Sequence, residues 1–359
     1  MKKVAFILNP ISGTRRKNAI VKHICRVLEH KKGYVAEFYR TKAVRDAYRA
    51  AKEFVAKEFD IIVAIGGDGT VNEVAEGLIG SNAKLGIIPM GSGNGLARHL
   101  DIPLLYHRAV ATLFEENTEC IDAGMINGKV FFCTAGVGFD AVVGERFNSS
   151  GARGLMTYME FCAKEYLKYT PEVYEIYVMG QKIKEKAFLI TFANSSQWGN
   201  NALIAPDANI SDGMMDVVVW RETPKVNMPI LTTELFTGTI KYSEFIDTYR
   251  CKEIKIVREH EGLIQFDGES MLMGKELDLS VIPQAIKVIV PSGWAPLPQF
   301  MDMMPAQFID FAATPFKEFV NKSLKGLTPD HIKELIPPPI KELKKQIKDI
   351  VPKLKDIVK

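Results

Sequence analysis

The residues best suited to ligand binding or catalysis form a glycine loop, Gly66-Gly67-Asp68-Gly69. This loop lies within the stretch FDIIVAIGGDGTVNEVAE at residues 59–76. The loop follows an Ile- and Val-rich run typical of a buried parallel strand and precedes apolar positions spaced for one helix face. Free N–H groups and the helix dipole at such a point suit phosphate. A carboxylate there, Asp68, requires a metal ion or a substrate hydroxyl between itself and the phosphate. A tight turn with a solvent-facing Asp is the alternative interpretation.

Two further loops of this kind end predicted strands. Residues 9–13, Asn-Pro-Ile-Ser-Gly, follow the strand Val4–Leu8, and residues 91–95, Gly-Ser-Gly-Asn-Gly, follow the strand Leu85–Ile88. Thr41 follows a third strand, Gly33–Tyr39. The predicted helices are Asn18–Leu28, Val44–Lys57, a helix after the Asp68 loop, and one from Leu96 onward. Consecutive strand–loop–helix units predict a parallel α/β sheet with ligand at the carboxyl ends of the strands. The loops lack P-loop and dinucleotide-binding spacings.

The second half of the chain has a different pattern. The β-prone runs are Lys129–Thr134, Tyr174–Met179, Lys186–Ala193, Asp216–Trp220, Ile254–Val257, Leu263–Phe266 and Ile286–Val290, with helix-like stretches at Leu155–Tyr169 and Val226–Phe236. Short strands separated by Gly, Asn and Pro predict a mostly β second domain. Two of its turns carry carboxylates, at residues 211–213 and 267–269, and an Asp-Gly pair is most often only a turn.

Composition excludes several classes of protein. At 359 residues, with a formal net charge of +3, the chain is long enough for two domains and a tail. The weak charge gives no basis for nucleic-acid binding. No apolar stretch approaches the roughly 20 residues that span a bilayer, and the short run after Met1 is interpreted as a strand rather than a signal peptide. The five scattered cysteines are expected to be reduced core residues of a cytoplasmic protein.

The last part of the chain, residues 292–359, begins Pro- and Met-rich and ends Lys-rich. One apolar helix face is formed by Ile340, Leu343, Ile347, Ile350, Leu354 and Ile357. Lysines flank this stripe, and Pro352 is expected to kink or end the helix. A basic amphipathic helix could lie on an anionic membrane surface. Packing on its own domain, or on a second subunit in a homodimer, is the alternative.

Together these motifs resemble the diacylglycerol kinase catalytic-domain family, which includes bacterial soluble lipid kinases and sphingosine kinases. The matching residues are Asn9-Pro10-x-Ser12-Gly13, Gly66–Glu73, Gly91–Asn94, Asp122-x-Gly124, Gly136-x-Gly138-Phe139-Asp140, Pro206-x-Ala208, Ser211-Asp212-Gly213 and Asp267-Gly268-Glu269. The match covers residues 4 to about 291, in the family's order, and excludes the tail. The resemblance implies an α/β ATP-binding domain at residues 1–123, similar to NAD kinases and phosphofructokinases, and a β-sandwich-like lipid-acceptor and metal domain at residues 124–291.

The resemblance also implies ATP and Mg²⁺ as cofactors. The residues expected to hold ATP are Asn9, Pro10, Ile11, Ser12, Gly13, Thr41, Gly66, Gly67, Asp68, Gly69, Thr70, Val71, Asn72 and Ser92. The residues matching the family's Mg²⁺ site are Asn209, Asp212 and Met214. Of these, only Asp212 could offer a side-chain carboxylate, so the other two would act through backbone carbonyls.

Two acidic residues compete for the role of catalytic base. Glu269 matches the base of the bacterial lipid kinases, whereas sphingosine kinases assign this role to the acidic residue of the glycine loop, here Asp68. We expect Glu269 to be the base and Asp68 to belong to the metal network and orient the acceptor; the reverse assignment stays open. Asp122 would extend the acidic network. Asp140 is expected either to contact the acceptor's head group or to be structural.

One departure from the family pattern bears on the substrate. Gly95 stands where bacterial diacylglycerol kinases often have Asp, and the run GSGNGLAR at residues 91–98 is more similar to sphingosine kinases. This difference removes one acidic group from the expected network. It favours a sphingoid base over diacylglycerol as the acceptor.

Three functions are compatible with these residues. The first is a Mg²⁺- and ATP-dependent kinase of a lipid hydroxyl, acting as a cytoplasmic protein on the inner membrane face. The second is a kinase of a soluble acceptor, as in NAD kinases, and the second-domain motifs argue against it. The third is a non-catalytic lipid sensor. Its expected signature, loss of an acidic or glycine-loop residue, is met only at Gly95.

Overall fold

The computed structural model describes residues 1–12, 17–151, 155–166, 168–224 and 227–294. The predicted tail helix lies outside the described residues, as does Gly13. Within the described ranges, no helix is long and apolar enough to cross a membrane.

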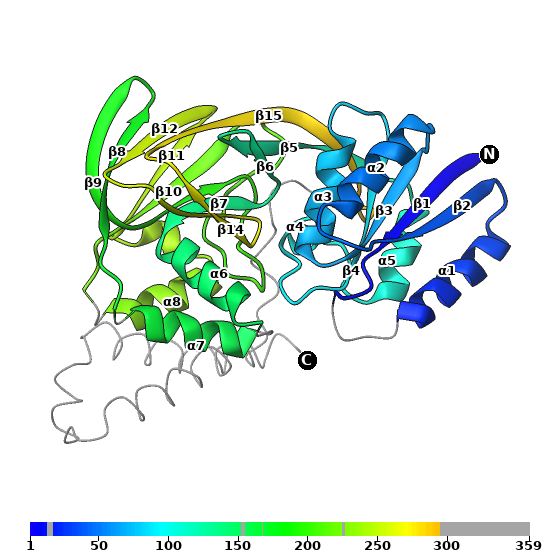
Figure 1. Cartoon of the computed structure of the whole chain (residues 1–359), viewed down its shortest axis with the longest axis horizontal. Helices are drawn as coiled ribbons and strands as arrows, with labels where there is room; N and C mark the ends of the chain where they lie inside the picture. The colour runs from blue at the N-terminus through cyan, green and yellow to red at the C-terminus, as the bar shows by residue number, and fades with distance from the viewer. Residues whose placement is uncertain (13–16, 152–154, 167, 225–226, 295–359) are drawn as a thin grey trace, which may run out of the picture. The chain divides into compact units, whose positions relative to one another are not determined.

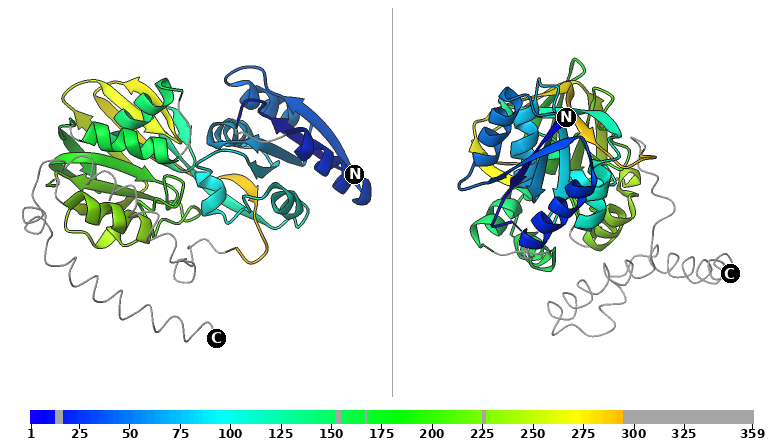
Figure 2. Two further views of the ribbon diagram at one scale, coloured as in Figure 1. Left: turned by 90° about the horizontal axis from the view of Figure 1, so that it is seen from below. Right: turned by 90° about the vertical axis from the view of Figure 1, so that its right-hand side faces the viewer.

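The first domain is a parallel sheet in the order β4-β3-β1-β2 (Figure 1). Its elements are β1 (Lys2–Leu8), α1 (Lys17–His30), β2 (Tyr34–Arg40), α2 (Asp46–Ala56), β3 (Ile61–Gly66), α3 (Asp68–Leu78), β4 (Lys84–Pro89), α4 (Gly95–His99) and α5 (Tyr106–Leu113). Helix α2 packs on α3 and α1 on α5, and Figure 2 shows these pairs on opposite faces of the sheet. Strand β3 is therefore buried along its whole length, which explains its Ile- and Val-rich sequence.

The second domain is antiparallel and forms a second core around Phe131, Tyr174 and Phe192. Its elements are β5 (Thr118–Ile126), β6 (Lys129–Phe131), β7 (Thr134–Gly138), α6 (Phe139–Ser149), α7 (Leu155–Tyr166), β8 (Glu172–Val178), β9 (Gln181–Ala193), β10 (Met215–Arg221), α8 (Met228–Thr237), the 3-10 helix η2 (Ile240–Tyr242), β11 (Ile246–Cys251), β12 (Glu253–Arg258), β13 (Gly262–Phe266), β14 (Glu269–Met273) and β15 (Glu276–Ile289). These two architectures confirm the predicted fold class.

Strand β15 connects the parallel and antiparallel parts of one continuous sheet, and β5 runs antiparallel to it. The first half of β15 pairs with β12, and its last residues pair with β4 of the parallel sheet. The β5–β15 ladder shifts register between Ile282 and Ile286. At that bulge Asp122, which is fully buried, accepts the N–H of Gln284 at 2.7 Å. Asp122 therefore fixes the point at which the chain passes from one part of the sheet to the other.

Several elements differ from the sequence-based expectations. Sequence analysis did not predict α5, α6, β5, β7, β11, β14 or the first part of β15. It assigned Ile286–Val290 to the second domain, whereas Lys287 and Val288 pair with β4. The five cysteines are free, as expected, but the core location holds only in part: Cys133 and Cys251 are buried, Cys120 and Cys162 are partly exposed, and Cys25 is exposed.

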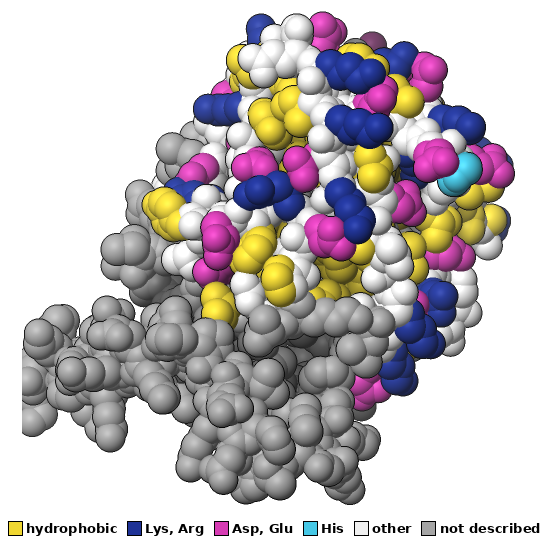
Figure 3. Space-filling view, turned by 90° about the vertical axis from the view of Figure 1, so that its left-hand side faces the viewer, with side chains coloured by type: hydrophobic (Ala, Val, Ile, Leu, Met, Phe, Trp, Pro, Cys, Tyr) yellow, Lys and Arg dark blue, Asp and Glu magenta, His cyan; other side chains and the backbone are white. Residues whose placement is uncertain are grey.

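The surface formed by β8 and β9 carries both signs of charge. Lys182 pairs with Glu175 and Lys186 with Glu222 on these strands and their neighbours. Figure 3, viewed from this side, shows basic and acidic side chains interspersed, with apolar side chains between them. Positive and negative side chains therefore offset each other on this face, as they nearly do over the whole chain.

Candidate active site

The glycine loop lies where the sequence predicts it, between β3 and α3, and it contacts the loop after β4. A Cβ built at Gly91 would lie 2.8 Å from the Cα of Gly67. Any side chain at Gly91 would therefore separate the two loops. The Met90 N–H donates to the Gly66 carbonyl at 2.7 Å. The backbone of both loops is thereby held at the carboxyl edge of the sheet, where a parallel α/β sheet places its ligand.

The Asp68 carboxylate binds the β4 loop. Its two oxygens accept the backbone N–H groups of Asn94 at 2.8 Å and Gly95 at 2.7 Å. Burial raises the pKa of Asp68, and these two hydrogen bonds and the nearby Arg98 oppose that rise. Arg98 also donates to the Gly93 carbonyl at 3.0 Å. Asp68 therefore joins the two loops, and a cation of the chain itself lies beside it.

The loop after β1 meets the glycine loop through one side-chain pair. Asn9 donates to the Thr70 hydroxyl at 3.0 Å and accepts the Ile11 N–H at 3.0 Å. Ser12 donates to the Asn9 carbonyl at 3.1 Å. Thr41 is buried, and its N–H donates to the Leu8 carbonyl at 3.0 Å. The structure thus brings three of the predicted loops to one edge of the sheet.

Two predicted ATP ligands differ in what their side chains can contact. Val71 is 6 % exposed and packs in the core, so it could contact a nucleotide only through its backbone. Ser92 is exposed in the β4 loop, and its hydroxyl has no hydrogen-bond partner among the described residues. A hydroxyl at that position is suitable for a phosphate oxygen.

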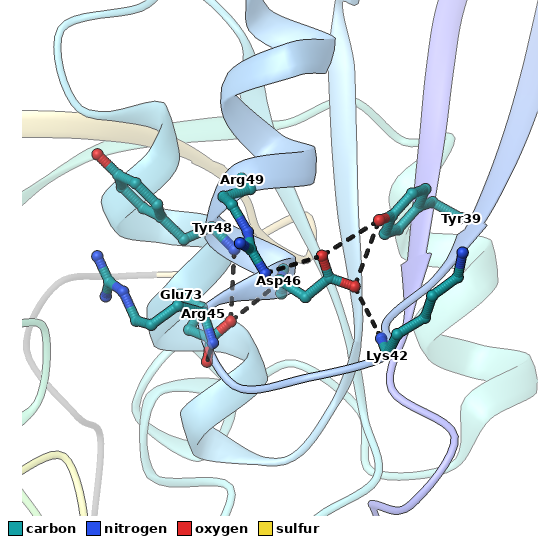
Figure 4. A network of polar contacts seen from close by, with 8 residues as sticks. Tyr39, Lys42, Arg45, Asp46, Tyr48, Arg49 and Glu73 are labelled. Atoms are coloured by element: carbon teal, nitrogen blue, oxygen red, sulfur yellow. Dashed lines mark hydrogen bonds and ion pairs between the residues drawn. The ribbon is translucent and has the colours of Figure 1, made fainter.

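The loop between β2 and α2 is held by two carboxylates (Figure 4). Asp46 accepts the Lys42 N–H at 2.7 Å and the Tyr39 hydroxyl at 3.2 Å. Glu73, from the first turns of α3, accepts the N–H groups of Arg45 at 2.9 Å and Ala47 at 3.1 Å. Glu73 therefore satisfies N–H groups at the start of α2, which have no partner within their own helix.

Asp267 binds the second domain to the glycine-loop helix. Its carboxylate accepts the Asn72 amide at 2.6 Å and the backbone N–H groups of Phe132, Cys133 and Thr134 at 2.7, 2.8 and 3.1 Å. Asn72, predicted as an ATP ligand, thus uses its amide to hold the Asp267 turn. Burial raises the pKa of Asp267, and these hydrogen bonds oppose the rise.

Glu269 follows this turn and lies beside the glycine loop. Its Oε1 is 3.5 Å from the position that a Cβ at Gly69 would occupy. Desolvation and the negative charge of Glu73 raise the pKa of the Glu269 carboxyl, and Arg45 opposes them. Arg45 itself forms an ion pair with Glu76. A carboxylate with a raised pKa at the N-terminus of α3 is suited to accept a proton from a bound hydroxyl.

The residues expected to hold Mg²⁺ do not form an open site. The Asp212 carboxylate accepts the Met214 N–H at 2.9 Å and forms an ion pair with Arg250. The Asn209 side-chain oxygen accepts the Ser211 N–H at 3.0 Å. Oxygen donors suit Mg²⁺, but a guanidinium on the one carboxylate does not, so these residues do not fit a divalent cation. Among the described residues, a hydrogen bond from the Gly213 N–H joins the segment of residues 209–214 to Asp122. No hydrogen bond of the described residues joins it to the glycine loop.

Comparisons with known proteins identify the family. Residues 3–126 match the family model "Diacylglycerol kinase catalytic domain", and residues 133–290 match "YegS C-terminal NAD kinase beta sandwich-like domain". A diacylglycerol kinase of Bacillus subtilis is 30% identical over 292 residues, covering 78% of this chain and 94% of that protein. This chain belongs to the diacylglycerol kinase catalytic-domain family. A probable YegS-like lipid kinase of Pseudomonas aeruginosa is 34% identical over 261 residues, covering 69% of this chain and 82% of that protein.

A solved structure shares the fold. The crystal structure of a diacylglycerol kinase from Bacillus anthracis has a TM-score of 0.67 at 22% identity, covering 82% of this chain and 98% of that one. The resemblance inferred from the motifs is thereby confirmed for the family and the fold.

In this family member Asp140 lies inside the second domain. It is 7 % exposed and accepts the Gln265 amide at 3.1 Å and the Ala141 N–H at 2.8 Å. Burial raises the pKa of Asp140 to about 7. The Asp140 carboxylate is thus held by the fold and is close to its charge transition at neutral pH.

Sequence analysis did not single out Glu73, Arg45 or Arg98 as site residues. Glu73 lies four residues after Gly69 on α3, a spacing that places both on one helix face. The spacing was readable from the sequence, but the role of Glu73 depends on α2, whose position only the tertiary structure gives.

Proposed function

We propose that this protein transfers the γ-phosphate of ATP to a hydroxyl group of a lipid, with Mg²⁺ on the nucleotide, at a membrane surface. The observation that carries the proposal is the position of Glu269, with its raised pKa, beside Gly69 of the glycine loop. The names of its relatives, diacylglycerol kinase and YegS-like lipid kinase, support a lipid as the acceptor.

The residues of the chain would divide the work as follows. Backbone N–H groups at the start of α3, with the loops at residues 9–12 and 91–93, would receive the phosphates. Glu269 would accept the proton of the attacking hydroxyl, because its carboxylate lies next to the glycine loop and, within the described residues, accepts no backbone N–H. Asp68 would keep the two loops together, since both of its oxygens already accept N–H groups. Mg²⁺ bound to ATP would neutralise charge on the transferred phosphoryl group.

This division assigns Asp68 mainly a positioning role and Glu269 the catalytic one. The proposal thus keeps the assignment expected from the sequence, in which Glu269 is the base. Asp68 acts by holding the β4 loop. Loss of a general base typically lowers the rate by about 10²–10⁴-fold. Loss of Asp68 would instead release the β4 loop and weaken both nucleotide binding and turnover.

The acceptor is proposed to be diacylglycerol, and a sphingoid base is the alternative. The relatives named diacylglycerol kinase support the first. Gly95, with the run GSGNGLAR, supports the second. A buried Asp140 with a pKa of about 7 could accept a hydrogen bond from either a hydroxyl or an amino group.

The test is transfer of labelled phosphate from Mg²⁺-ATP to diacylglycerol, sphinganine or phosphatidylglycerol in mixed micelles. We expect product on one lipid, with kcat reduced by about 10²-fold or more in Glu269→Gln. The matched control is Glu276→Gln, which removes an exposed carboxylate paired with Lys255 and should leave the rate unchanged. Product on NAD and on no lipid, or a Glu269→Gln variant with full activity, would contradict the proposal.

A further inference from the structure

The segment before β10 concentrates negative charge in the second domain. Asp207 and Asp212 lie in it, and Asp216 follows on β10. Where such carboxylates also lie close together in space, a positive partner lowers their mutual repulsion. In the part of the chain that the structure describes, there is no group of three or more His, Cys, Asp or Glu side chains that could hold a metal ion.

Arginine supplies the positive partner of Asp212. One carboxylate oxygen accepts the Met214 N–H at 2.9 Å, and the other pairs with the Arg250 guanidinium. The Asp212 side chain is 20% exposed and that of Arg250 is 51% exposed. A divalent cation on Asp212 would lie next to this guanidinium, and the two positive charges would repel each other.

The other side-chain oxygens around the segment also have donors. Asp207 accepts from Lys241 at 2.7 and 2.5 Å. Asp122 accepts the Gly213 N–H at 2.6 Å, and the Asn209 oxygen accepts the Ser211 N–H and hydroxyl at 3.0 and 3.1 Å. These hydrogen bonds occupy side-chain oxygens near Asp212 that could otherwise supplement its carboxylate as ligands of a cation.

The sheet positions Arg250 for this role. Arg250 on β11 is directly opposite Asp216 on β10 in the antiparallel register. From this register position its guanidinium forms the ion pair with Asp212. Burial and the charge of Asp207 raise the pKa of Asp216 to about 6. A guanidinium remains charged at every pH at which the protein is folded, so the segment has a permanent positive partner.

We propose that the Arg250 guanidinium is the resident cation of residues 207–214, in place of the divalent metal that the family resemblance implies there. The segment then folds without Mg²⁺. This inference does not depend on the proposed kinase reaction, because the Mg²⁺ that accompanies ATP belongs to the glycine-loop site.

Thermal unfolding of the full chain without nucleotide tests this inference, in EDTA and in saturating MgCl₂. We expect the wild type to unfold at the same temperature in both. Arg250→Ala should unfold at a lower temperature in EDTA, and Mg²⁺ should raise its midpoint by roughly 2–4 °C. The rise should be absent from the double variant Arg250→Ala/Asp212→Asn, which lacks the carboxylate. Arg250→Lys, which keeps a positive charge, should respond to Mg²⁺ less than Arg250→Ala.

Lys186→Ala is the matched control, because it removes the cation of the exposed Lys186–Glu222 pair in the same sheet. It should show no Mg²⁺ response. A wild-type midpoint that rises with Mg²⁺, and no longer does so in Asp212→Asn, would overturn the proposal. So would an Arg250→Ala variant that Mg²⁺ does not stabilise, since Arg250 would then only pack. If Arg250→Ala does not fold, terbium(III) luminescence decides: a wild-type signal abolished by Asp212→Asn overturns the proposal, and equal signals support it.

Discussion

The capacity of Glu269 to accept a proton depends on the charges around it. The turn Asp267-Gly268-Glu269 places its carboxylate beside Gly69, and Asp267 holds that turn with four hydrogen bonds. Desolvation, Glu73, Asp267 and Glu76 raise the pKa of Glu269, while Arg45 lowers it. Desolvation is the largest cause of the raised pKa, and the charges of Glu73 and Arg45 adjust it in opposite directions.

Removing the charge of Glu73 should shift the pH dependence of catalysis. A base works in its ionised form, so the rate rises with pH through the pKa of Glu269. In Glu73→Gln the ionised form loses a negative neighbour, the pKa of Glu269 falls, and the acidic limb of kcat/KM moves to lower pH. The amide oxygen of Gln can still accept the N–H of Ala47, which binds one oxygen of Glu73, while the N–H of Arg45, which binds the other, loses its acceptor. The measurement is the pH–rate profile on the active lipid.

Arg45→Met is the opposite test. It removes the cation that lowers the pKa of Glu269, so the acidic limb should move to higher pH. Identical profiles in both variants and the wild type would show that the group titrating in the reaction is not Glu269.

At the scale of the elements, helix α4 is joined to the loop after β9 by a buried histidine. His99 is 5 % exposed, and its Nδ1 accepts the Ser196 N–H at 3.2 Å and lies 2.9 Å from the Ser196 hydroxyl. Its Nε2 has no hydrogen-bond partner within the described ranges. Protonating Nδ1 would break the bond from the Ser196 N–H in a buried site. Burial accordingly lowers the pKa of His99 to about 4.

This histidine should make the protein less stable in mild acid. The unfolded chain binds a proton at His99 below pH of about 6.5, whereas the folded protein does so only below about 4. Stability is therefore lost as the pH falls through this interval, and His99 should contribute about 2 kcal/mol of the loss between pH 7 and pH 5. Urea unfolding at the two pH values measures it. His99→Gln should reduce the difference, and His260→Gln, at an exposed histidine, should leave it unchanged.

At the scale of the whole molecule, Asp122 joins the two parts of the sheet. One of its oxygens accepts the Gln284 N–H at the β15 bulge and the other accepts the Gly213 N–H. The Asn194 amide also donates to the Asp122 carbonyl at 3.0 Å. Asp122 was expected to extend an acidic network, and in the structure its carboxylate instead holds backbone of the second domain against the shared strands.

Asp122→Asn should therefore lower the stability of the whole chain. The substituted side chain presents an NH₂ group to one of two part-buried N–H donors, and an unsatisfied donor costs up to about 1–3 kcal/mol when it is buried. Chemical unfolding should show a loss of this size in both EDTA and Mg²⁺. The control is Asp278→Asn, at an exposed position of β15. A loss seen only in Mg²⁺ would instead identify Asp122 as a metal ligand.

The sequence by itself determined the parallel sheet, the glycine loops at its carboxyl edge and the family. These depend on local patterns: a buried run such as β3 is apolar throughout, and a strand–loop–helix unit carries its own turn residues. The predicted strands of the second domain were correct in most places for the same reason. Strands β11 and β14 were missed because their partly exposed sequences do not alternate clearly.

Only the tertiary structure decided how the carboxylates are used. Asp68, Asp122, Asp212 and Asp267 all looked like candidates for chemistry in the sequence, yet each accepts backbone N–H groups from distant or adjacent loops. Glu269, in contrast, lies beside the glycine loop with a raised pKa. The sequence could not give this division, because a carboxylate's role depends on which donors and charges the fold brings to it, and those come from segments up to 195 residues away.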